Sequence, residues 1–177
     1  MTSEFPIIPM NELGNYMVGQ ALPSSEFSKE EGVRLLRGDN VKTGFIQWGE
    51  KEFLWPKGSE GLEKYLLESG DIVIGMDGSR LGRNWSLVLE KDLPALLVQR
   101  VARIRPHDEV CREMICSAID SHFFRWYIHS VSTGSAIPHV SHSDLANFPV
   151  PYPNENFRMK LSSLSISTRG LIDTQRA

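Results

Sequence analysis

The sequence predicts an α+β fold, a small mixed, mostly antiparallel sheet with a packed helix and a C-terminal helical arm. Three observations predict it. Residues 71–76 are apolar on both faces of a strand and stop at the turn signal Asp77-Gly78. Residues 109–131 carry apolar side chains at helical spacing. Prolines at 149, 151 and 153 then separate the domain from a C-terminal segment with an apolar stripe.

Two strands and one helix are expected before the central strand. The strand at 33–37 runs into the turn-forming Gly38-Asp39-Asn40, and a second strand lies near 45–48. Residues 57–69 place leucines and a tyrosine at helical spacing, which predicts a short helix that ends near Gly70.

Two more strands and the main helix are expected after it. Residues 85–89 and 98–104 have strand character, and Pro106 ends the second of these strands. Asp108 is a suitable N-cap for a single helix over 109–131.

The chain then leaves the helix through a loop, a short turn at 143–145 and the segment 148–153. This segment cannot form a central strand, because its three prolines have no amide hydrogen to donate to a ladder. We expect an extended edge or a connector there.

An arm is expected over 154–177, which leaves residues 1–153 as the globular domain. Phe157, Leu161, Leu164, Thr168 and Leu171 recur at spacings of 4, 3, 4 and 3, typical of a helical seam over about two heptads. Two heptads are too few for a stable coiled coil, so the helix is expected to pack against something outside the domain, and the alternative is that it folds back on its own domain. The residues expected to contact a partner helix are Phe157, Leu161, Leu164 and Leu171.

Length and composition indicate a soluble cytoplasmic protein with no membrane partner. The N-terminus lacks the basic flank and apolar run of a signal peptide, and no stretch reaches the roughly 18 apolar residues of a membrane span. Cys111 and Cys116 fall about 140° apart around the expected helix, which argues against a disulfide between them.

The formal net charge of −3 is unevenly distributed. Residues 78–105 contain six Lys or Arg residues and only two Asp or Glu residues, so the rest of the chain is acidic. Because Lys and Arg supply most non-specific affinity for phosphates, the net negative charge argues against a freestanding DNA clamp, although the central stretch is basic.

Three segments together resemble the specificity subunits of type I restriction-modification systems. Their order and spacing match that family over nearly the whole chain, from about Ile8 to the end. After Asn156 the chain departs from the family, since its short tail lacks the glutamine of the usual proline-glutamate-glutamine start. The matching segments are Leu35 to Gly44, Gly70 to Ser79 continued by Leu93 to Ile104, and Thr133 to Ser141 followed by Asp144-Leu145 and Pro149 to Pro153.

The resemblance implies a target-recognition domain that binds one half of a bipartite site in double-stranded DNA. It also implies a spacer arm onto which modification methyltransferase subunits dock, with restriction subunits joining through them. Family members usually carry two recognition domains and two arms, whereas this chain resembles one of each. It is then either one excised domain or a half-subunit that associates with itself through the arm.

The glycine-flanked loop after the central strand is the first expected DNA contact. Two glycines let its backbone approach a ligand, and arginine and asparagine suit guanine, phosphate and adenine. The alternative is a plain hairpin with solvated arginines. The residues concerned are Ser79, Arg80, Arg83 and Asn84.

Three further groups are expected to contact DNA, each with a plainer alternative. In the strand that follows, Arg103 and Arg105 share one face and are assigned to phosphate, while Arg100 is expected to be structural, paired with Asp71 or Asp77. The other groups are polar loops that are otherwise ordinary solvated surface. They contain Asn40, Lys42 and Thr43, and Ser135, His139 and His142.

No metal site, cofactor or catalytic centre is predicted. The histidines fit no HExxH pattern, and Pro151-Tyr152-Pro153 has the wrong order for the catalytic tetrad of a methyltransferase. No convincing acidic and lysine set for a nuclease is present. The expected function is therefore non-enzymatic DNA sequence recognition, and the alternative is a protein-interaction scaffold that keeps the recognition-domain fold without reading DNA.

Overall fold

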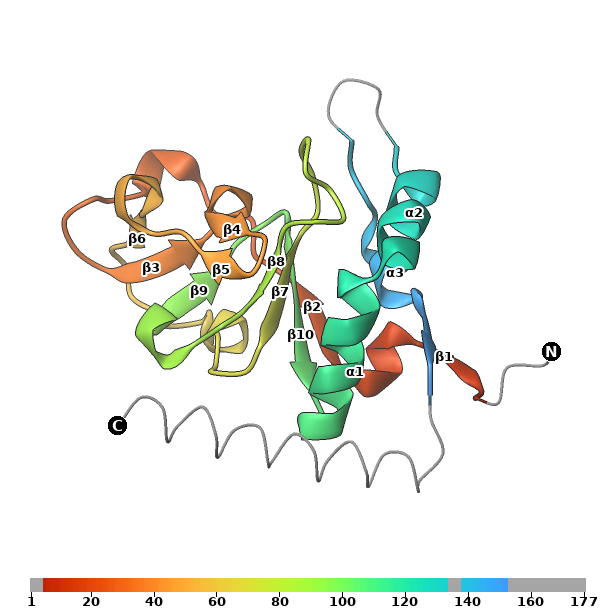
Figure 1. The fold of residues 1–177 in the computed structure, drawn as a ribbon. Coiled ribbons are helices and arrows are strands. Elements are labelled where there is room, and N and C mark those ends of the chain that lie inside the picture. The colour runs from red at the N-terminus through yellow and green to blue at the C-terminus, as the bar shows by residue number, and fades with distance from the viewer. Residues whose placement is uncertain (1–4, 134–137, 153–177) are drawn as a thin grey trace, which may run out of the picture.

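The computed structural model describes residues 5–133 and 138–152, and a four-stranded antiparallel sheet lies at its centre (Figure 1). Helices cover one face of this sheet, and a smaller β-rich lobe lies against the other (Figure 1). In spatial order the sheet contains β2 (Gly14–Val18), β10 (Val101–Pro106), β7 (Ile72–Gly75) and β8 (Trp85–Leu87).

The predicted strand at 71–76 is confirmed as β7, and both of its faces are buried. Ile72 and Ile74 point into the core beneath the helices, whereas Val73 points into the core shared with the β-rich lobe. All three side chains are at most 1% exposed. The strand predicted over 98–104 begins later than expected, at Val101 of β10, because Arg100 before it has φ of 67°.

The helical layer consists of α1 (Glu109–Asp120) and α2 (His122–Val131). Asp108 caps α1 as predicted, accepting a hydrogen bond from the Cys111 amide at 2.7 Å. The prediction of one helix over 109–131 is wrong, because Ser121 has extended backbone and its hydroxyl caps α2 at the Phe124 amide, 3.0 Å away. The change of direction lets both short helices bury apolar residues against the sheet. Cys111 is buried and Cys116 is half-buried, and the two are not joined by a disulfide.

The β-rich lobe contains a three-stranded sheet and a hairpin. In the sheet β3 pairs antiparallel with β6 and parallel with β9, which makes the fold mixed but mostly antiparallel, as predicted. The predicted strands at 33–37 and 45–48 are confirmed in shorter form. Their bounds are β3 (Val33–Leu36), β4 (Val41–Lys42), β5 (Phe45–Ile46), β6 (Leu54–Trp55) and β9 (Ala95–Leu97).

The predicted helix over 57–69 is wrong. Only one 3₁₀ turn, η5 (Glu63–Tyr65), forms there. The following leucines are extended and pair with β9, since the Leu67 amide donates to the Ala95 carbonyl at 2.9 Å. Leu67 is 5% exposed, so burial of the leucines against the rest of the fold outweighs the helical periodicity of the segment. The other 3₁₀ turns are η1 (Met10–Leu13), η2 (Ser24–Glu26), η3 (Gly38–Asn40), η4 (Gly49–Lys51) and η6 (Glu90–Asp92).

The two ends of the described chain meet in a two-stranded ribbon. β1 (Ile7–Pro9) pairs antiparallel with β11 (Pro149–Pro151), and the Tyr152 amide donates to the Pro6 carbonyl at 2.7 Å. The proline-rich segment is therefore an edge element, as predicted. The predicted turn before it is a short helix, α3 (His142–Ala146). The predicted arm over 154–177, with Phe157, Leu161, Leu164 and Leu171, lies outside the described residues.

A buried ion pair joins β10 of the central sheet to residues 66–71, the segment that leads into β7. Asp71 is 1% exposed, and Arg105 of β10 binds it through both ends of the guanidinium, Nε to Oδ1 at 2.8 Å and Nη2 to Oδ2 at 2.9 Å. Arg105 also contacts Glu68 and the Leu66 carbonyl. These hydrogen bonds to Asp71 raise the pKa of Arg105. The expectation that Arg105 contacts DNA phosphate is corrected, because its donors are occupied within the fold.

Arg103 is corrected in the same way. It is 4% exposed and donates to the Lys64 carbonyl at 3.3 Å. Its burial lowers the pKa of the guanidinium. Arg103 and Arg105 share one face of β10, as predicted, but that face is turned toward the β-rich lobe instead of solvent.

Replacing Arg105 with Met should lower the free energy of unfolding by about 2–4 kcal/mol, because Asp71 would stay buried without its partner, and partial exposure of the arginine moderates the loss. Urea denaturation monitored by circular dichroism measures this. The double variant Arg105→Met, Asp71→Asn should recover part of the loss, and strictly additive effects would contradict the proposed coupling.

Candidate nucleic-acid interface

The loop after β7, residues 77–84, is fixed at its centre to helix α2. Leu81 is 1% exposed, and Gly82 has φ of 75°. A Cβ on Gly82 would lie 3.4 Å from the Ile128 side chain, so glycine permits both the backbone conformation and the close approach. The loop therefore presents Ser79, Arg80 and Arg83 from a fixed base, and all three are exposed.

Hydrogen bonds within the loop hold its shape. The Leu81 amide donates to the Gly78 carbonyl at 3.1 Å, and the Arg83 amide donates to the Arg80 carbonyl at 3.0 Å. Asn84, the last predicted contact in this loop, is half-buried and its Oδ1 atom is inaccessible to solvent. In this conformation Asn84 does not offer the oxygen of a bidentate adenine contact.

A second loop lies directly beside the first. The Gly78 amide donates to the Pro138 carbonyl at 3.1 Å, and Asp77 and His139 form an isolated antiparallel bridge. The structure thus brings His139 next to Asp77, the first residue of the arginine-bearing loop. His142 instead begins α3, with its ring 4.7 Å from that of Tyr16. Ser135 lies outside the described residues.

The β4–β5 hairpin supplies a third loop. The Gly44 amide donates to the Trp85 carbonyl at 2.8 Å, which places the hairpin tip against the start of β8. Thr43 is exposed and Lys42 is half-buried at this tip. We call residues 42–44, 77–84 and 138–139 together the three-loop face.

Asn40 does not belong to this face, which corrects its predicted role. Its side chain is fully buried and its hydrogen bonds hold the turn before the hairpin. Oδ1 accepts from the Arg37 amide at 3.0 Å, and Nδ2 donates to the carbonyls of Gln47 and Lys51 at 2.9 and 3.1 Å.

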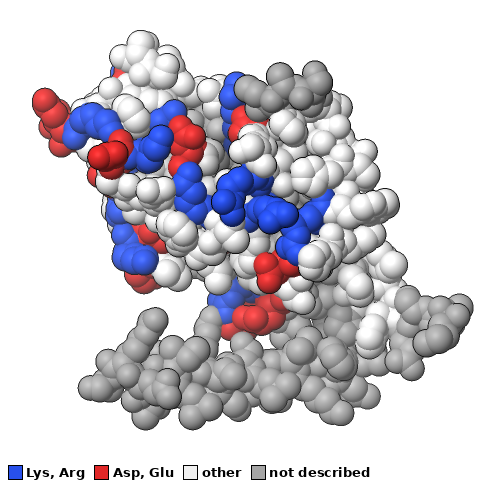
Figure 2. Space-filling view, turned by 45° about the horizontal axis from the view of Figure 1, so that its top comes forward, with Lys and Arg blue, Asp and Glu red and all other residues white. Residues whose placement is uncertain are grey.

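Positive charge gathers around the three-loop face. The β7–β8 loop stands at the top of Figure 1, and Figure 2, with that top turned forward, shows Lys and Arg in a band across the middle. A Cβ on Gly82 would lie 3.5 Å from Cα of Arg125 in α2, whose guanidinium donates to the Asp120 carbonyl at 2.9 Å. The predicted pairing of Arg100 with Asp77 is confirmed, with Nη1 3.2 Å from Oδ2, although the arginine side chain is 68% exposed. Arg37 was not predicted, because only tertiary contacts place it near the base of the loop.

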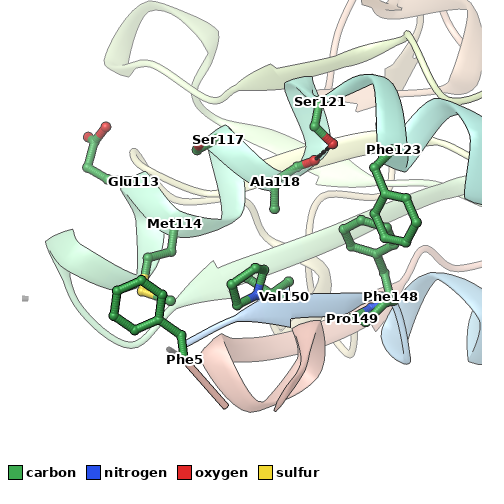
Figure 3. A pocket seen from close by; sticks show the side chains of 11 residues that line it. Phe5, Glu113, Met114, Ser117, Ala118, Ser121, Phe123, Phe148, Pro149 and Val150 are labelled. Atoms are coloured by element: carbon green, nitrogen blue, oxygen red, sulfur yellow. Dashed lines mark hydrogen bonds between the residues drawn. The ribbon is translucent and has the colours of Figure 1, made fainter. Parts of the chain in front are cut away.

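A separate apolar groove of about 650 Å³ lies between α1, the start of α2 and β11 (Figure 3). Phe123 is 50% exposed at its edge and stacks on Trp126, which is 64% exposed, with 5.7 Å between ring centroids. Figure 3 shows Phe5 and Met114 meeting at one end of the groove and Phe123 and Phe148 at the other. Among the described residues that line the groove, Glu113 alone is charged. An apolar surface of this kind is typical of protein contacts rather than of DNA contacts.

Other site types find no support in the described part of the chain. Within residues 5–133 and 138–152, no three His, Cys, Asp or Glu side chains are grouped so as to hold a metal ion. In the same ranges, none of the helices has the length and apolar character required to traverse a bilayer.

Comparison with known proteins identifies relatives. No protein-family model matches the chain. It is 28% identical over 179 aligned positions to the type I restriction enzyme MjaVIII specificity subunit of Methanocaldococcus jannaschii, covering 98% of this chain and 41% of the relative. It is 30% identical over 141 positions to the type I restriction enzyme EcoAI specificity subunit of Escherichia coli, covering 77% of this chain and 23% of the relative. The chain is a relative of the type I specificity subunits. It spans less than half the length of either one.

Solved structures of type I specificity subunits share the fold. The HsdS subunit from Thermoanaerobacter tengcongensis matches 98% of this chain with a TM-score of 0.60 at 14% identity, over 39% of its own length. The S subunit from M. genitalium matches 98% with a TM-score of 0.56 at 17% identity, over 42% of its length. A chain from a structure of type I restriction-modification complex assembly matches 99% with a TM-score of 0.63 at 13% identity, over 40% of its length. The α+β fold expected from the resemblance is thereby confirmed.

Replacing Asn40 with Ala should lower the free energy of unfolding by about 2–3 kcal/mol, because three buried hydrogen bonds lose their side-chain partner. Thermal and urea denaturation measure this change. The neighbouring exposed variant Thr43→Ala should stay within about 0.5 kcal/mol of the parent protein. Equal stability of both variants would contradict the structural role given to Asn40.

Proposed function

We propose that this chain recognises DNA sequence as half of the specificity subunit of a type I restriction-modification complex. In this role it directs methyltransferase and restriction subunits to one half of a bipartite site. The observation that carries the proposal is the fixed loop at 77–84, which exposes Arg80 and Arg83 and is joined at its first residue to His139. The tip of the β4–β5 hairpin lies against Trp85, directly after the loop. The names of the relatives support the same function.

The geometry suits reading by loops instead of by one recognition helix. Exposed arginines on a rigid base can meet guanine edges or phosphates without first ordering a flexible segment. The role is non-catalytic, and the methyltransferase subunits supply the chemistry. Because the net charge is −3, we expect the chain alone to bind DNA weakly and the assembled complex to bind it tightly.

Alanine at Arg80 or Arg83 should weaken binding to the recognised duplex by about 1–3 kcal/mol if the side chain contacts a base, and should change the methylated sequence. Fluorescence anisotropy with the methyltransferase subunits present measures affinity, and methylome sequencing of cells carrying each variant reports the site. Lys91→Ala, an exposed cation on η6 outside the three-loop face, is the matched control.

An unchanged methylation mark in both arginine variants would remove the loop from the interface. Tight binding of methyltransferase subunits without any DNA sequence preference would support the scaffold alternative, in which the fold persists but DNA reading is lost. Steep salt dependence together with a sequence preference supports recognition.

We also propose that residues 1–153 form the recognition domain and that residues 154–177 form an arm through which two copies of this chain associate. The apolar groove of Figure 3 is the surface that we assign to the arm of the second copy. The chain covers 41% of the length of the MjaVIII subunit. The apolar stripe of the arm, Phe157 to Leu171, has the composition that such a groove buries. We infer that assembly takes place in the cytoplasm, where cysteines that form no disulfide stay reduced.

Serine in place of Phe123, or in place of both Leu161 and Leu164, should shift the protein toward monomer, because each change removes apolar surface from one side of the proposed contact. Analytical ultracentrifugation at several concentrations measures the dissociation constant. Phe45→Ser is the control, since Phe45 is 54% exposed outside the groove. A monomeric parent protein, or loss of dimer in the control alone, would contradict the assignment.

A further inference from the structure

A cleft of about 330 Å³ lies at the base of the three-loop face, between the β-rich lobe and the central sheet. Arg37, Gly38 and Asp39 line it from the turn after β3, and Gln99 and Arg100 line it from the turn before β10. Asp77, the first residue of the arginine-bearing loop, also lines the cleft. The cleft therefore adjoins the proposed DNA contact without containing Arg80 or Arg83.

Arg100 occupies a backbone conformation in which glycine would be unstrained. Its φ of 67° is the only positive value among non-glycine residues of the described ranges 5–133 and 138–152. Neighbouring hydrogen bonds impose this conformation, since the Met76 amide donates to the Arg100 carbonyl at 3.0 Å and the Gln99 amide donates to the Gln20 carbonyl at 3.0 Å. Strained residues of this kind gather at functional sites.

The Arg100 guanidinium is held by a single exposed contact. Its side chain is 68% exposed, and Nη1 lies 3.2 Å from Oδ2 of Asp77. This contrasts with Arg105, which is 29% exposed and grips the buried Asp71 through two nitrogens. An exposed one-point ion pair is weak and exchangeable, whereas a buried two-point pair is not.

A second guanidinium lines the same cleft from the other lobe. Arg37 stacks over Phe53, 5.0 Å from the ring centroid, and its Nη2 lies 3.9 Å from Oδ2 of Asp39. The aromatic ring fixes the position of the guanidinium while its carboxylate partner remains at the limit of ion-pair distance. Two guanidiniums that line one cleft from different turns, each loosely paired, match the two non-bridging oxygens that share the charge of a phosphodiester.

We propose that this cleft binds a backbone phosphate of the DNA duplex through Arg100 and Arg37, and that Asp77 holds Arg100 until the phosphate replaces it. The inference rests on the proposed function and adds a phosphate site to it. Because Asp77 competes with the phosphate for Arg100, it lowers the affinity of the free protein for DNA. Asp77 also begins the loop that carries Arg80 and Arg83, so the exchange occurs at the point where the loop leaves the sheet.

Fluorescence anisotropy measures duplex binding at salt concentrations from about 50 to 300 mM. This range gives the slope of log affinity against log salt concentration. The full chain is used with its methyltransferase subunits and with a duplex carrying the methylated sequence. Arg100→Gly should weaken binding roughly tenfold and reduce the salt slope by about 0.9, the value for one phosphate contact. The melting temperature should not fall, because glycine adopts the positive φ without strain.

Asp77→Asn should act in the opposite direction and tighten binding, since it frees Arg100 while leaving the bridge to His139 in the backbone. Arg37→Ala should weaken binding as Arg100→Gly does. Lys57→Ala is the matched control and should bind as the parent protein does. Lys57 is a 62% exposed cation in a single ion pair with Glu26, and it lies outside the cleft.

Single methylphosphonate linkages, placed in turn along the duplex, identify the phosphate. One neutral linkage should weaken binding of the parent protein and abolish its difference from Arg100→Gly. Inorganic phosphate added at constant ionic strength should reduce this difference only if the site also takes the free ion.

If the parent protein binds duplex with a sequence preference and Arg100→Gly binds identically, the phosphate site is wrong and the proposed function stands. An Asp77→Asn variant that binds more weakly would overturn the competition between Asp77 and phosphate. If the parent complex shows no DNA binding, both the proposed function and this inference are overturned.

Discussion

The burial of β7 on both faces is the constraint on which the rest of the molecule depends. Ile72 and Ile74 pack under the helices while Val73 packs against the β-rich lobe, so one short strand holds two cores together. Each fully buried aliphatic side chain contributes about 1.5–3 kcal/mol relative to exposure. Because the strand is fixed from both sides, its C-terminal end is a stable point from which a loop can project. The loop at 77–84 starts there and gains a further anchor where Leu81 enters the core.

Arginines in this fold serve different purposes that depend on what surrounds them. Arg105 is committed to Asp71 and joins the central sheet to the segment before it. Arg80 and Arg83 are exposed on the anchored loop. Arg100 lies between these extremes, exposed but paired once with Asp77. The same side chain is a structural clamp when its donors are satisfied in the interior and a ligand-binding group when they face solvent.

Two surfaces of opposite chemistry lie on different elements of the described chain. The three-loop face is polar and surrounded by cations, and its loops are joined by backbone hydrogen bonds. The groove of Figure 3 is lined almost wholly by apolar residues from α1, α2 and β11. This separation is what the two proposed contacts, one with a nucleic acid and one with a protein partner, require if neither is to exclude the other. It also keeps the ribbon of β1 and β11, which carries the chain toward residue 153, beside the apolar surface.

The sequence by itself determined the features that depend on local chemistry. The apolar run at 71–76 predicted a doubly buried strand, Asp108 predicted a helix start, and the prolines at 149–153 predicted an edge element, because each signal acts through neighbouring backbone. Sequence also placed Ser79, Arg80 and Arg83 on an exposed glycine-flanked loop. Their contact with DNA stays a prediction.

Only the tertiary structure decided which polar residues are available. Asn40, Arg103 and Arg105 are residue types that commonly contact DNA. Packing against distant segments buries Asn40 and Arg103 and engages the donors of Arg105 within the fold. The expected helix over 57–69 failed for the same reason, since pairing with β9 outweighed a weak helical periodicity. The cleft between Arg37 and Arg100 joins residues more than sixty positions apart, and no local pattern encodes such proximity. The sequence gives the charge and hydrophobicity of each residue, whereas its exposure depends on how distant segments pack together.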